Sequence, residues 1–218
     1  MKIVATNASY KMIVKKLEFN YTFAANCYFY IDEMTKHGFI IDPSVHAKEL
    51  MKIIKENNWQ IEKILLTHSH LDHIGAVLEL SNTLNVNFYA LNTSSQYLSN
   101  PDLDTHFTDF DVIKGISPLK DGEEITLSSN PSVKLKTIAT PGHTLDSAIY
   151  YDQKENLAFT GDTIFSSGIG RTDIEGSGGN YQELMANIKN KIFTLPGNTV
   201  LYPGHGPQTT IGQEKSPT

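Results

Sequence analysis

Cysteine is almost missing from this sequence, since Cys27 is the only one among 218 residues. An intramolecular disulfide is therefore excluded. Cys27 lies in an apolar segment that predicts a strand, where a small core residue is expected rather than a nucleophile. No apolar run approaches the roughly 20 residues of a transmembrane helix, and residues 1–17 lack the apolar core of a signal peptide. We expect a cytoplasmic protein with no membrane partner.

Positive charge is not in excess either, because 18 lysines and arginines stand against 24 aspartates and glutamates. The net charge of -6 disfavours a nucleic-acid partner held by a basic surface. Internal repeats, heptad patterns and low-complexity segments are also missing. The hydrophobic content of 39% is ordinary for a globular protein. This length suits one domain over residues 1–218 rather than two.

Hydrophobic patterning predicts strands near residues 10–18, 23–31, 37–42, 61–66, 88–91, 111–118, 123–127, 132–138, 147–151, 156–160 and 199–201. Helices are predicted over residues 45–57, 74–84 and 180–192, the first of them opened by Asp42-Pro43-Ser44. Residues 92–110 are polar and aromatic and are expected to form a helix and a loop over a site. Two halves, each with strands followed by helices, predict two sheets packed face to face with helices outside.

The most informative segment is Thr67-His68-Ser69-His70-Leu71-Asp72-His73, directly after a predicted strand. Three imidazoles and a carboxylate this close together indicate a site, because His and Asp are seldom buried without partners. Zinc, iron and manganese all accept these ligands. His68 and His70 are two residues apart and can share a face. The adjacent Asp72 and His73 diverge, so the spacing predicts two neighbouring metal ions. The alternative is a solvated turn in which Asp72 caps a helix.

Three further ligand-type residues, His143, Asp162 and His205, each come just after a predicted strand. Open sheets tend to place their sites at the carboxyl ends of strands. Each of the three alone is more typical of a turn or a helix cap, but together they predict one metal centre with the 68–73 segment. His106 has no ligand-type neighbour at a suitable spacing, and we expect it in a solvated loop.

These motifs resemble the metallo-β-lactamase fold superfamily, whose signature His-x-His-x-Asp-His is matched by residues 68–73. The remaining ligands of that family correspond to His143, Asp162 and His205. The segments 160–165, 168–173 and 202–207 are similar to those of short, glyoxalase II-like (hydroxyacylglutathione hydrolase-like) hydrolases of bacteria and archaea. The resemblance covers nearly the whole chain. It implies an α/β (α+β) fold, an αββα sandwich of two mixed sheets flanked by helices.

The resemblance also implies which residues hold the metals. One ion would be held by His68, His70 and His143, the other by Asp72, His73 and His205, and Asp162 would bridge the two. Zinc is expected, with iron or manganese as alternatives, because His and Asp suit all three metals.

Two such ions can share a water and present it as hydroxide to a carbonyl, and a thiolate leaves readily. A thioester hydrolase is therefore expected. Asp72 is expected to hydrogen-bond the hydroxide as well as to ligate a metal. Arg171 is expected to bind a carboxylate of the substrate, with an exposed ion pair to Asp173 as its alternative. Gly168 and Gly170 are expected to let the backbone approach the substrate.

The expected substrate is a small-molecule thioester with an anionic thiol carrier, such as S-lactoylglutathione. Full-length glyoxalase II enzymes carry a C-terminal helical extension that helps to bind glutathione, and they usually have a lysine and a tyrosine where this chain has Arg171 and Asp173. We therefore expect weak binding of a glutathione carrier. The oligomeric state is expected to be a monomer or a homodimer.

Other functions stay open. A persulfide dioxygenase with one iron shares the Gly-x-Gly-Arg-Thr-Asp motif, but typically has His-Asp-Tyr where this chain has residues 205–207. A β-lactamase would place a cysteine or no ligand at Asp162. A nuclease acting on phosphodiesters is disfavoured by the acidic charge, and a non-catalytic module would leave seven ligand-type residues without a use.

Overall fold

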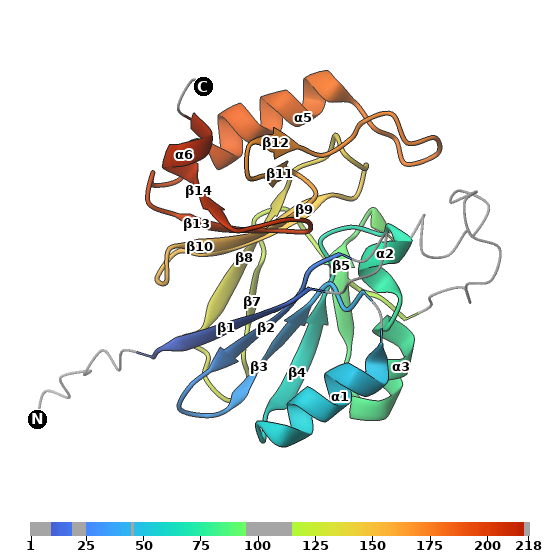
Figure 1. Ribbon diagram of the computed structural model, residues 1–218, viewed down its shortest axis with the longest axis vertical. Coiled ribbons are helices and arrows are strands. Elements are labelled where there is room, and N and C mark those ends of the chain that lie inside the picture. The colour runs from blue at the N-terminus through green and yellow to red at the C-terminus, as the bar shows by residue number, and fades with distance from the viewer. Residues whose placement is uncertain (1–9, 19–24, 45, 95–114, 216–218) are drawn as a thin grey trace, which may run out of the picture.

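The computed structural model of the protein describes residues 10–18, 25–44, 46–94 and 115–215. Its centre consists of two six-stranded mixed sheets (Figure 1). The first sheet has the order β1 (Met12–Leu17), β2 (Cys27–Asp32), β3 (His37–Ile41), β4 (Gln60–Leu65), β5 (Phe88–Leu91) and β6 (Ser117–Leu119). Its first three strands are antiparallel, whereas β3 to β6 are parallel.

The second sheet comes mostly from the C-terminal half of the chain. Its order is β14 (Thr209–Thr210), β13 (Val200–Pro203), β10 (Leu157–Gly161), β9 (Ala148–Asp152), β8 (Lys134–Ala139) and β7 (Glu124–Thr126). The β10–β13 pair is parallel, and the other pairs are antiparallel. A separate short hairpin joins β11 (Ile164–Phe165) to β12 (Gly168–Ile169).

Helices cover the outer face of each sheet (Figure 1). The first sheet is covered by α1 (Ala47–Glu56) and α3 (Val77–Leu84), and the second by α5 (Tyr181–Asn187), the π-helical turn η2 (Ile188–Ile192) and α6 (Ile211–Lys215). The very short α2 (Leu71–Ile74) precedes α3. Among the described residues, no helix is long and apolar enough to cross a membrane. The predicted αββα sandwich of two mixed sheets is therefore confirmed.

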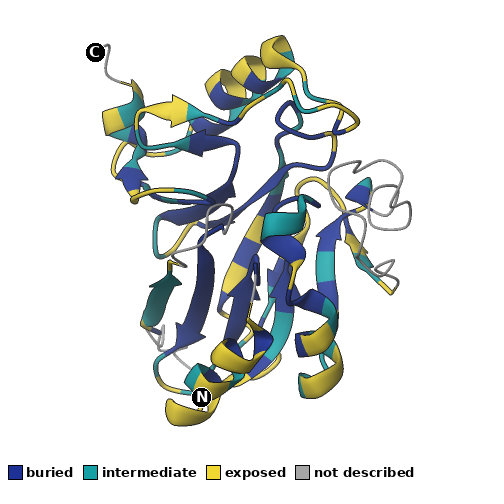
Figure 2. Cartoon of the chain, turned by 45° about the vertical axis from the view of Figure 1, so that its right-hand side comes forward, coloured by how far each residue is buried: buried dark blue, intermediate teal, exposed yellow. Residues whose placement is uncertain are grey.

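Alternation along single strands explains the layers. In β2, Phe29 and Ile31 pack against α1 and α3, whereas Tyr28 and Tyr30 pack between the two sheets. Successive side chains of a strand point to opposite faces, so a strand that is buried on both faces can supply two cores. Figure 2 shows the consequence, with buried strands at the centre and exposed residues on the outward sides of the helices. Cys27 is fully buried in the core below α1, as expected for a packing residue.

Most predicted elements are present, with differences that have local causes. The helix predicted over 74–84 is broken into α2 and α3, and the one predicted over 180–192 changes from α5 into a π-helical turn. The two-residue strands β11, β12 and β14 were not predicted, because two residues are too few to show a periodicity. Most of the segment 92–110, with His106, lies outside the described residues, as does Val45 of the first predicted helix.

Candidate metal centre

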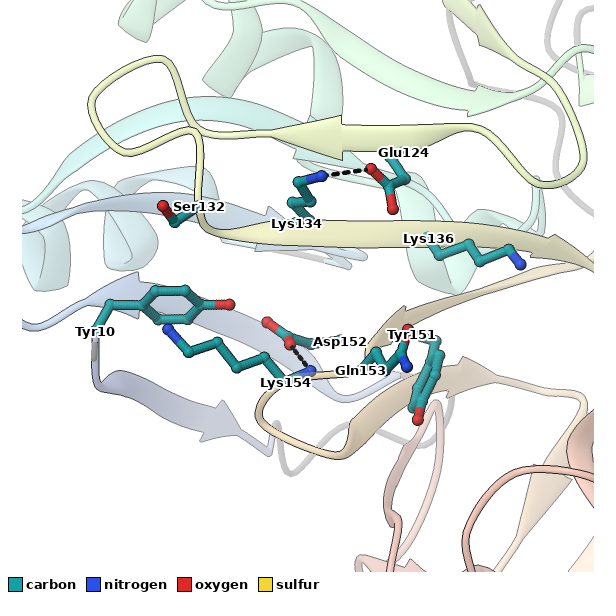
Figure 3. Close-up of a pocket in the computed structure, with 9 residues that line it drawn as sticks. All are labelled: Tyr10, Glu124, Ser132, Lys134, Lys136, Tyr151, Asp152, Gln153 and Lys154. Carbon is teal, nitrogen blue, oxygen red and sulfur yellow. Dashed lines mark hydrogen bonds and ion pairs between the residues drawn. The ribbon is translucent and has the colours of Figure 1, made fainter. Parts of the chain in front are cut away.

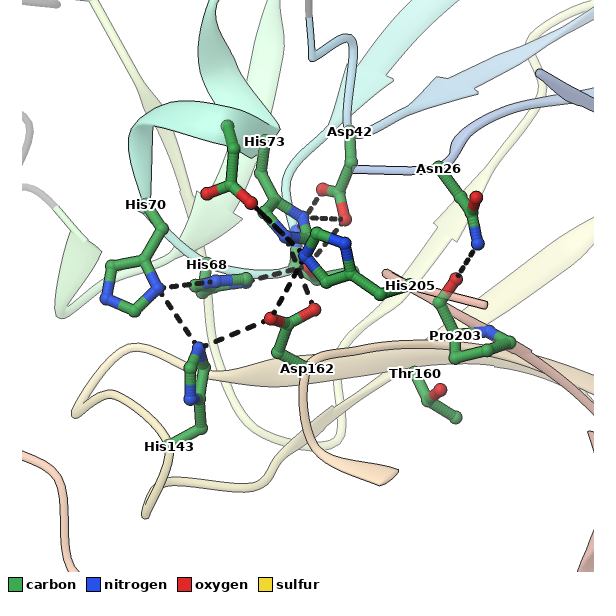
Figure 4. A network of polar contacts seen from close by, with 12 residues as sticks. Asn26, Asp42, His68, His70, His73, His143, Thr160, Asp162, Pro203 and His205 are labelled. Atoms are coloured by element: carbon green, nitrogen blue, oxygen red, sulfur yellow. Dashed lines mark hydrogen bonds and ion pairs between the residues drawn. The ribbon is translucent and has the colours of Figure 1, made fainter. Parts of the chain in front are cut away.

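The sheet topology brings the predicted ligand residues to one place (Figure 4). His68 and His70 follow β4, and Asp72 and His73 lie within the four-residue helix α2. His143, Asp162 and His205 follow β8, β10 and β13, which all run in the same direction within the second sheet. The carboxyl ends of strands that run the same way meet at one edge of a sheet. Three overlapping sets of these side chains offer ligand atoms within 4.8 Å of one another: His68, His70 and His143; His68, His73 and Asp162; and Asp72, His73 and His205.

The first set consists of three imidazoles. Nδ1 of His70 lies 3.1 Å from Nε2 of His68 and 3.0 Å from Nε2 of His143. All three rings approach edge to face, with centroids 4.7–4.9 Å apart. Three ring nitrogens that face a common point form a set of donors suited to one divalent metal ion.

We call Asp72, His73 and His205 the second set, which combines one carboxylate with two imidazoles. Oδ2 of Asp72 lies 3.1 Å from Nε2 of His205 and 3.8 Å from Nε2 of His73. This side of the centre is the more open one, because the side chain of His205 is 39% exposed and that of Asp72 is 26% exposed, whereas His73 is fully buried. A small molecule can therefore approach the centre from the side of Asp72 and His205.

Asp162 lies between the two sets. Its Oδ1 is 3.3 Å from Nε2 of His73, and its Oδ2 is 3.4 Å from Nε2 of His205 and 3.6 Å from Nε2 of His143. One carboxylate therefore faces an imidazole of the first set and two imidazoles of the second.

Asp42 orients two of the histidines, and the sequence analysis missed it. Its Oδ1 accepts a hydrogen bond from the backbone N–H of Thr67 at 2.7 Å, and its Oδ2 accepts one from the Thr67 hydroxyl at 2.6 Å. Nδ1 of His73 lies 2.9 Å from the same Oδ2. A carboxylate can only accept, so Nδ1 of His73 carries the proton. The Thr67 hydroxyl already donates its hydrogen to Asp42. Its oxygen therefore accepts a hydrogen bond from Nδ1 of His68 at 3.1 Å.

These bonds decide which ring nitrogen faces the centre with a lone pair. In neutral imidazole one nitrogen is a donor and the other an acceptor. With Nδ1 held as a donor, His68 and His73 both direct Nε2 toward the cluster, where each offers a lone pair when its imidazole is neutral. Groups of this kind behind metal-binding histidines fix the tautomer and the direction of the ring. The sequence held one signal for Asp42, its place at the carboxyl end of a predicted strand, but it was interpreted as a helix start.

Arg171 acts on the centre through its backbone. Its carbonyl oxygen accepts a hydrogen bond from Nδ1 of His143 at 2.6 Å, so His143 also presents Nε2 to the cluster. The guanidinium is 70% exposed and pairs with both oxygens of Asp173, at 2.9 and 3.1 Å. The ion pair that was the alternative for this side chain is therefore present in the structure.

Two glycines allow the backbone to pack against the cluster. A Cβ at Gly204 would lie 2.1 Å from Oδ1 of Asp162 and 2.6 Å from Cε1 of His73. A Cβ at Gly170 would lie 1.9 Å from the carbonyl oxygen of Asp162 and 3.0 Å from the ring of His143. The close approach that Gly170 permits is thus to the metal centre rather than to a substrate, while Gly168 has open space around it.

The loop that carries His205 is held by the first sheet. Nδ2 of Asn26 donates to the carbonyl oxygens of Pro203 at 2.9 Å and Gly206 at 3.0 Å, and the hydroxyl of Tyr28 donates to that of Pro203 at 2.6 Å. Asn26 is buried. The two sheets are therefore joined by hydrogen bonds at the very loop that carries a ligand-type residue.

Burial and charge set the protonation of the cluster. Burial holds the pKa of His68 well below its usual value, and the nearby imidazoles lower it further. Burial likewise lowers the pKa of His70 to about 4. Burial also lowers the pKa of His73, but the carboxylates of Asp162, Asp72 and Asp42 outweigh it and raise that pKa well above the usual range. The imidazoles of the first set are thus neutral. In the second set, the carboxylates favour the protonated form of His73.

The residues present fit divalent metal ions. Nε2 of His73 and Oδ1 of Asp162 are buried, and neither has a hydrogen-bond partner among the described residues. Buried polar atoms normally have hydrogen-bond partners. Two such atoms without partners, 3.3 Å apart in the cluster, indicate a position suited to a metal ion. Burial raises the pKa of Asp162, but the charge of His73 and a hydrogen bond from His205 hold it well below its usual value. A buried ionised carboxylate among several histidine imidazoles is the chemistry of a cation site.

A cavity of about 450 Å³ lies away from this centre (Figure 3). It is lined by Tyr10, Glu124, Ser132, Lys134, Lys136, Tyr151, Asp152, Gln153 and Lys154. Asp152 ends β9 and Lys134 begins β8, whereas the metal centre lies at the other ends of these two strands. The cavity therefore belongs to the opposite edge of the second sheet and takes no part in the site.

Known proteins are similar to this chain in sequence and in structure. A family model described as the Metallo-beta-lactamase superfamily matches residues 20–205. Hydroxyacylglutathione hydrolase GloC from Haemophilus influenzae is 32% identical over 195 residues, which cover 88% of this chain and 90% of that protein. Probable metallo-hydrolase YqgX from Bacillus subtilis is 32% identical over 196 residues, covering 88% of this chain and 89% of that protein.

Solved structures agree. BLEG-1 B3 metallo-beta-lactamase has a TM-score of 0.83 and 35% identity, covering 93% of this chain and 96% of that one. TTHA1623 in a di-iron-bound form has a TM-score of 0.77 and 27% identity, with the same coverage of 93% and 96%. ETHE1 from Myxococcus xanthus has a TM-score of 0.75 and 27% identity, covering 94% of this chain and 82% of that one. With its fold, its cluster of histidines and aspartates and these matches, the chain belongs to the metallo-β-lactamase superfamily of metal-dependent hydrolases.

Proposed function

We propose that this protein is a thioester hydrolase of the glyoxalase II type that binds two divalent metal ions and cleaves small S-acyl thiols. The observation that carries the proposal is the position of Asp162, whose carboxylate oxygens face His73 on one side and His143 and His205 on the other. A carboxylate shared by two sets of ligands suits a bridge between two ions. The similarity to hydroxyacylglutathione hydrolase GloC supports the thioester.

Each metal would be held by one set of side chains. His68, His70 and His143 would hold the first ion, and Asp72, His73 and His205 the second, with Asp162 between them. When bound, divalent ions polarise a carbonyl and lower the pKa of water toward neutrality. Zinc is the first candidate because tetrahedral histidine and carboxylate sites suit it. Iron is the second, since the similar TTHA1623 is described in a di-iron-bound form.

Asp72 is the proposed catalytic residue. Its carboxylate is the one that reaches the open side of the centre, beside His205. Burial raises its pKa, but the charge of His73 and a hydrogen bond from His205 outweigh this and lower the pKa below the usual value. The side chain is therefore ionised at neutral pH and can accept a hydrogen bond from the attacking water, which orients the water toward the acyl carbon.

Arg171 is the proposed substrate-binding residue. Its guanidinium is exposed and has its nearest anion in Asp173. A carboxylate on the thiol carrier would share the guanidinium with Asp173 or take the place of the Asp173 carboxylate.

We propose a small-molecule substrate, and neither a nucleic acid nor a membrane as a partner. We also propose that the protein is cytoplasmic and is a monomer or a homodimer.

Two measurements on purified protein test the proposal. Elemental analysis of protein prepared without chelator should give close to two metal ions per chain. Hydrolysis of S-lactoylglutathione and of smaller thioesters should then be followed by release of the thiol, with an oxygen electrode in the same cell. We expect thiol release without oxygen uptake, and a high KM for S-lactoylglutathione. If the protein binds two metal ions but cleaves no thioester, the proposed metal site stands and the proposed substrate is wrong.

Two other reactions have support of their own. BLEG-1, a B3 metallo-beta-lactamase, is 35% identical to this chain, which favours lactam hydrolysis as the second candidate. ETHE1 from Myxococcus xanthus is 27% identical, and persulfide oxidation with one iron is the third. The assay therefore includes nitrocefin and glutathione persulfide under the same conditions. Nitrocefin cleavage alone would favour the lactamase, and oxygen uptake with the persulfide alone would favour the dioxygenase.

A further inference from the structure

A buried carboxylate beside the metal centre belongs to neither set of ligand residues. Asp146 and Ser69 are both buried, and the hydroxyl of Ser69 donates to Oδ2 of Asp146. Oδ1 of Asp146 is also buried, without a hydrogen-bond partner among the described residues. A carboxylate buried with so few partners is costly. Its presence here calls for a role in the structure around it.

The Ser69–Asp146 bond joins two segments that approach each other at the start of β9. The backbone N–H of Ala148, the first residue of β9, donates to the carbonyl oxygen of Thr67 at 2.8 Å. Ser69 lies two residues after Thr67, and Asp146 lies two residues before Ala148. The side-chain bond therefore lies next to this backbone contact, two residues before β9 begins and beyond the end of β4.

These two segments carry the whole three-histidine set. Ser69 is flanked by His68 and His70, and Asp146 lies three residues after His143. The turn from Gly142 to Ser147 is stiffened from within, because the N–H of Gly142 donates to the carbonyl oxygen of Thr144, and the N–H of Thr144 donates to the hydroxyl of Ser147. A displacement of Asp146 relative to Ser69 is therefore passed on to the distance between His143 and the other two imidazoles.

The second set depends on other contacts. His73 is oriented by Asp42, and the loop of His205 is held by Asn26 and Tyr28. None of these contacts involves Ser69 or Asp146. Asp42 bears on both sets, through His73 and through Thr67 beside His68. Ser69 and Asp146, in contrast, contact only the segments of the three-histidine set, so a selective effect is measurable.

We infer that Asp146, acting through the hydroxyl of Ser69, is a positioning residue for His68, His70 and His143 and sets the affinity of that set for a divalent metal ion. The inference rests on the proposed function only in that it takes these histidines to bind a metal. The hydrogen bond, rather than the charge, is the feature that matters, because Asp146 contacts no ring nitrogen: Nδ1 of His68 is held by Thr67 and Nδ1 of His143 by Arg171.

The test is a titration of metal-free protein with Co²⁺, followed by visible absorption and by competition with a chromophoric chelator. In Asp146→Ala, the affinity of one Co²⁺ position should fall by about tenfold or more, as for other groups behind metal ligands. The other position should stay within about twofold. Asp146→Asn should bind like the wild type, because its amide oxygen can still accept from Ser69.

A matched control removes a hydroxyl–carboxylate bond at the far end of the same strand. The buried hydroxyl of Tyr30 donates to Asp152 at 2.7 Å, and Asp152 ends β9, which Ala148 begins. Tyr30→Phe should lower the melting temperature and leave both Co²⁺ affinities unchanged. If Asp146→Ala does not fold, the double variant Ser69→Ala/Asp146→Ala replaces it, since it leaves no hydroxyl or carboxylate unpaired.

A second comparison identifies the affected position. When His143→Ala has already removed one ligand of the first set, Asp146→Ala should have little further effect on Co²⁺ binding, because the two changes act on the same position. Three results would each overturn the inference. Asp146→Ala could weaken Co²⁺ binding equally at both positions, or it could leave both Co²⁺ affinities unchanged. The third is that Asp146→Asn binds Co²⁺ as weakly as the alanine variant. Wild-type protein that binds no Co²⁺ would instead overturn the proposed function.

Discussion

Asp42 and His73 are 31 residues apart in the chain and in direct contact in the fold, with Oδ2 of the aspartate 2.9 Å from Nδ1 of the histidine. The same carboxylate accepts both the N–H and the hydroxyl of Thr67, and Thr67 in turn contacts His68. One buried side chain therefore directs one imidazole from each set of ligand residues. Asp42 therefore orients histidines of the metal centre without itself facing the metal positions.

Replacement of Asp42 by asparagine should weaken metal binding. The amide has one acceptor and one donor group, so either Thr67 or His73 would lose its acceptor. We expect metal affinity to fall by about 10- to 100-fold, as measured by chelator competition. Asp152→Asn is the control, because Asp152 is an equally buried acceptor of several hydrogen bonds far from the centre. It should lower stability only. Unchanged metal affinity in Asp42→Asn would contradict the role given to Asp42.

The proposed ligands should be needed for turnover. Asp162→Ala and His143→Ala are each expected to lower kcat by about a hundredfold or more, which corresponds to at least ~2.7 kcal/mol of barrier, while the circular dichroism spectrum stays that of the wild type. His37→Ala is the contrast, since His37 pairs with Glu62 away from the cluster and should retain turnover. Near-normal kcat in either ligand variant would remove that residue from the site.

Removal of metal should lower thermal stability. Without an ion, Nε2 of His73 and Oδ1 of Asp162 remain buried without hydrogen-bond partners among the described residues, and two carboxylates, those of Asp72 and Asp162, face the centre. Any ion that binds only the folded state stabilises it by an amount that grows with its concentration. The melting temperature should therefore fall after chelation and rise again as zinc, iron or manganese is added. A melting temperature independent of metal would count against a resident metal in the folded protein.

Gly204 should tolerate no side chain. A methyl group there would lie 2.1 Å from Oδ1 of Asp162 and 2.6 Å from the ring of His73, so one of the two must move. We expect Gly204→Ala to lose metal affinity and turnover, measured by chelator competition and thiol release. Gly197→Ala is the matched control, since a Cβ there meets no atom within 4 Å. Equal behaviour of the two variants would show that the ligands can adapt.

Stability at acid pH should depend on Glu62. Burial raises the pKa of its carboxyl, but hydrogen bonds from Ser129, Ser128 and His37 outweigh this and lower the pKa to about 2, from an ordinary 4.5. A depressed pKa adds stability above the unfolded value, and this stability is lost as the pH falls through the folded value. Glu62→Gln should therefore lower the free energy of unfolding at pH 7.

The difference between Glu62→Gln and the wild type should shrink as the pH falls from about 4.5 toward about 2. Urea denaturation at a series of pH values measures it. Glu124→Gln serves as comparison, because its ion pair with Lys134 is exposed and such pairs contribute little. A constant difference between Glu62→Gln and wild type down to the acid limit would be inconsistent with a depressed pKa.

The two-sheet fold and the residues that meet at the metal centre can both be predicted from the sequence. Alternation of apolar residues marks strands over a few positions, and the types and spacing of His68, His70, Asp72 and His73 carry their chemistry locally. These are short-range properties, so they can be read without knowing which strands pair. Elements of two residues, such as β11 and β14, carry too little pattern for this.

The residues that hydrogen-bond to the ligand residues and their neighbours could be identified only from the tertiary structure. Asp42 was interpreted as a helix start, Arg171 as a side chain for the substrate, and Asp146 was not singled out at all. Their contacts, with His73, with His143 and with Ser69, join residues 28 to 77 positions apart. Such contacts depend on how the two sheets pack and on the register of their strands, which no local pattern encodes. The physical reason is that a hydrogen bond requires its two atoms within about 3 Å, and only the packed sheets bring them there.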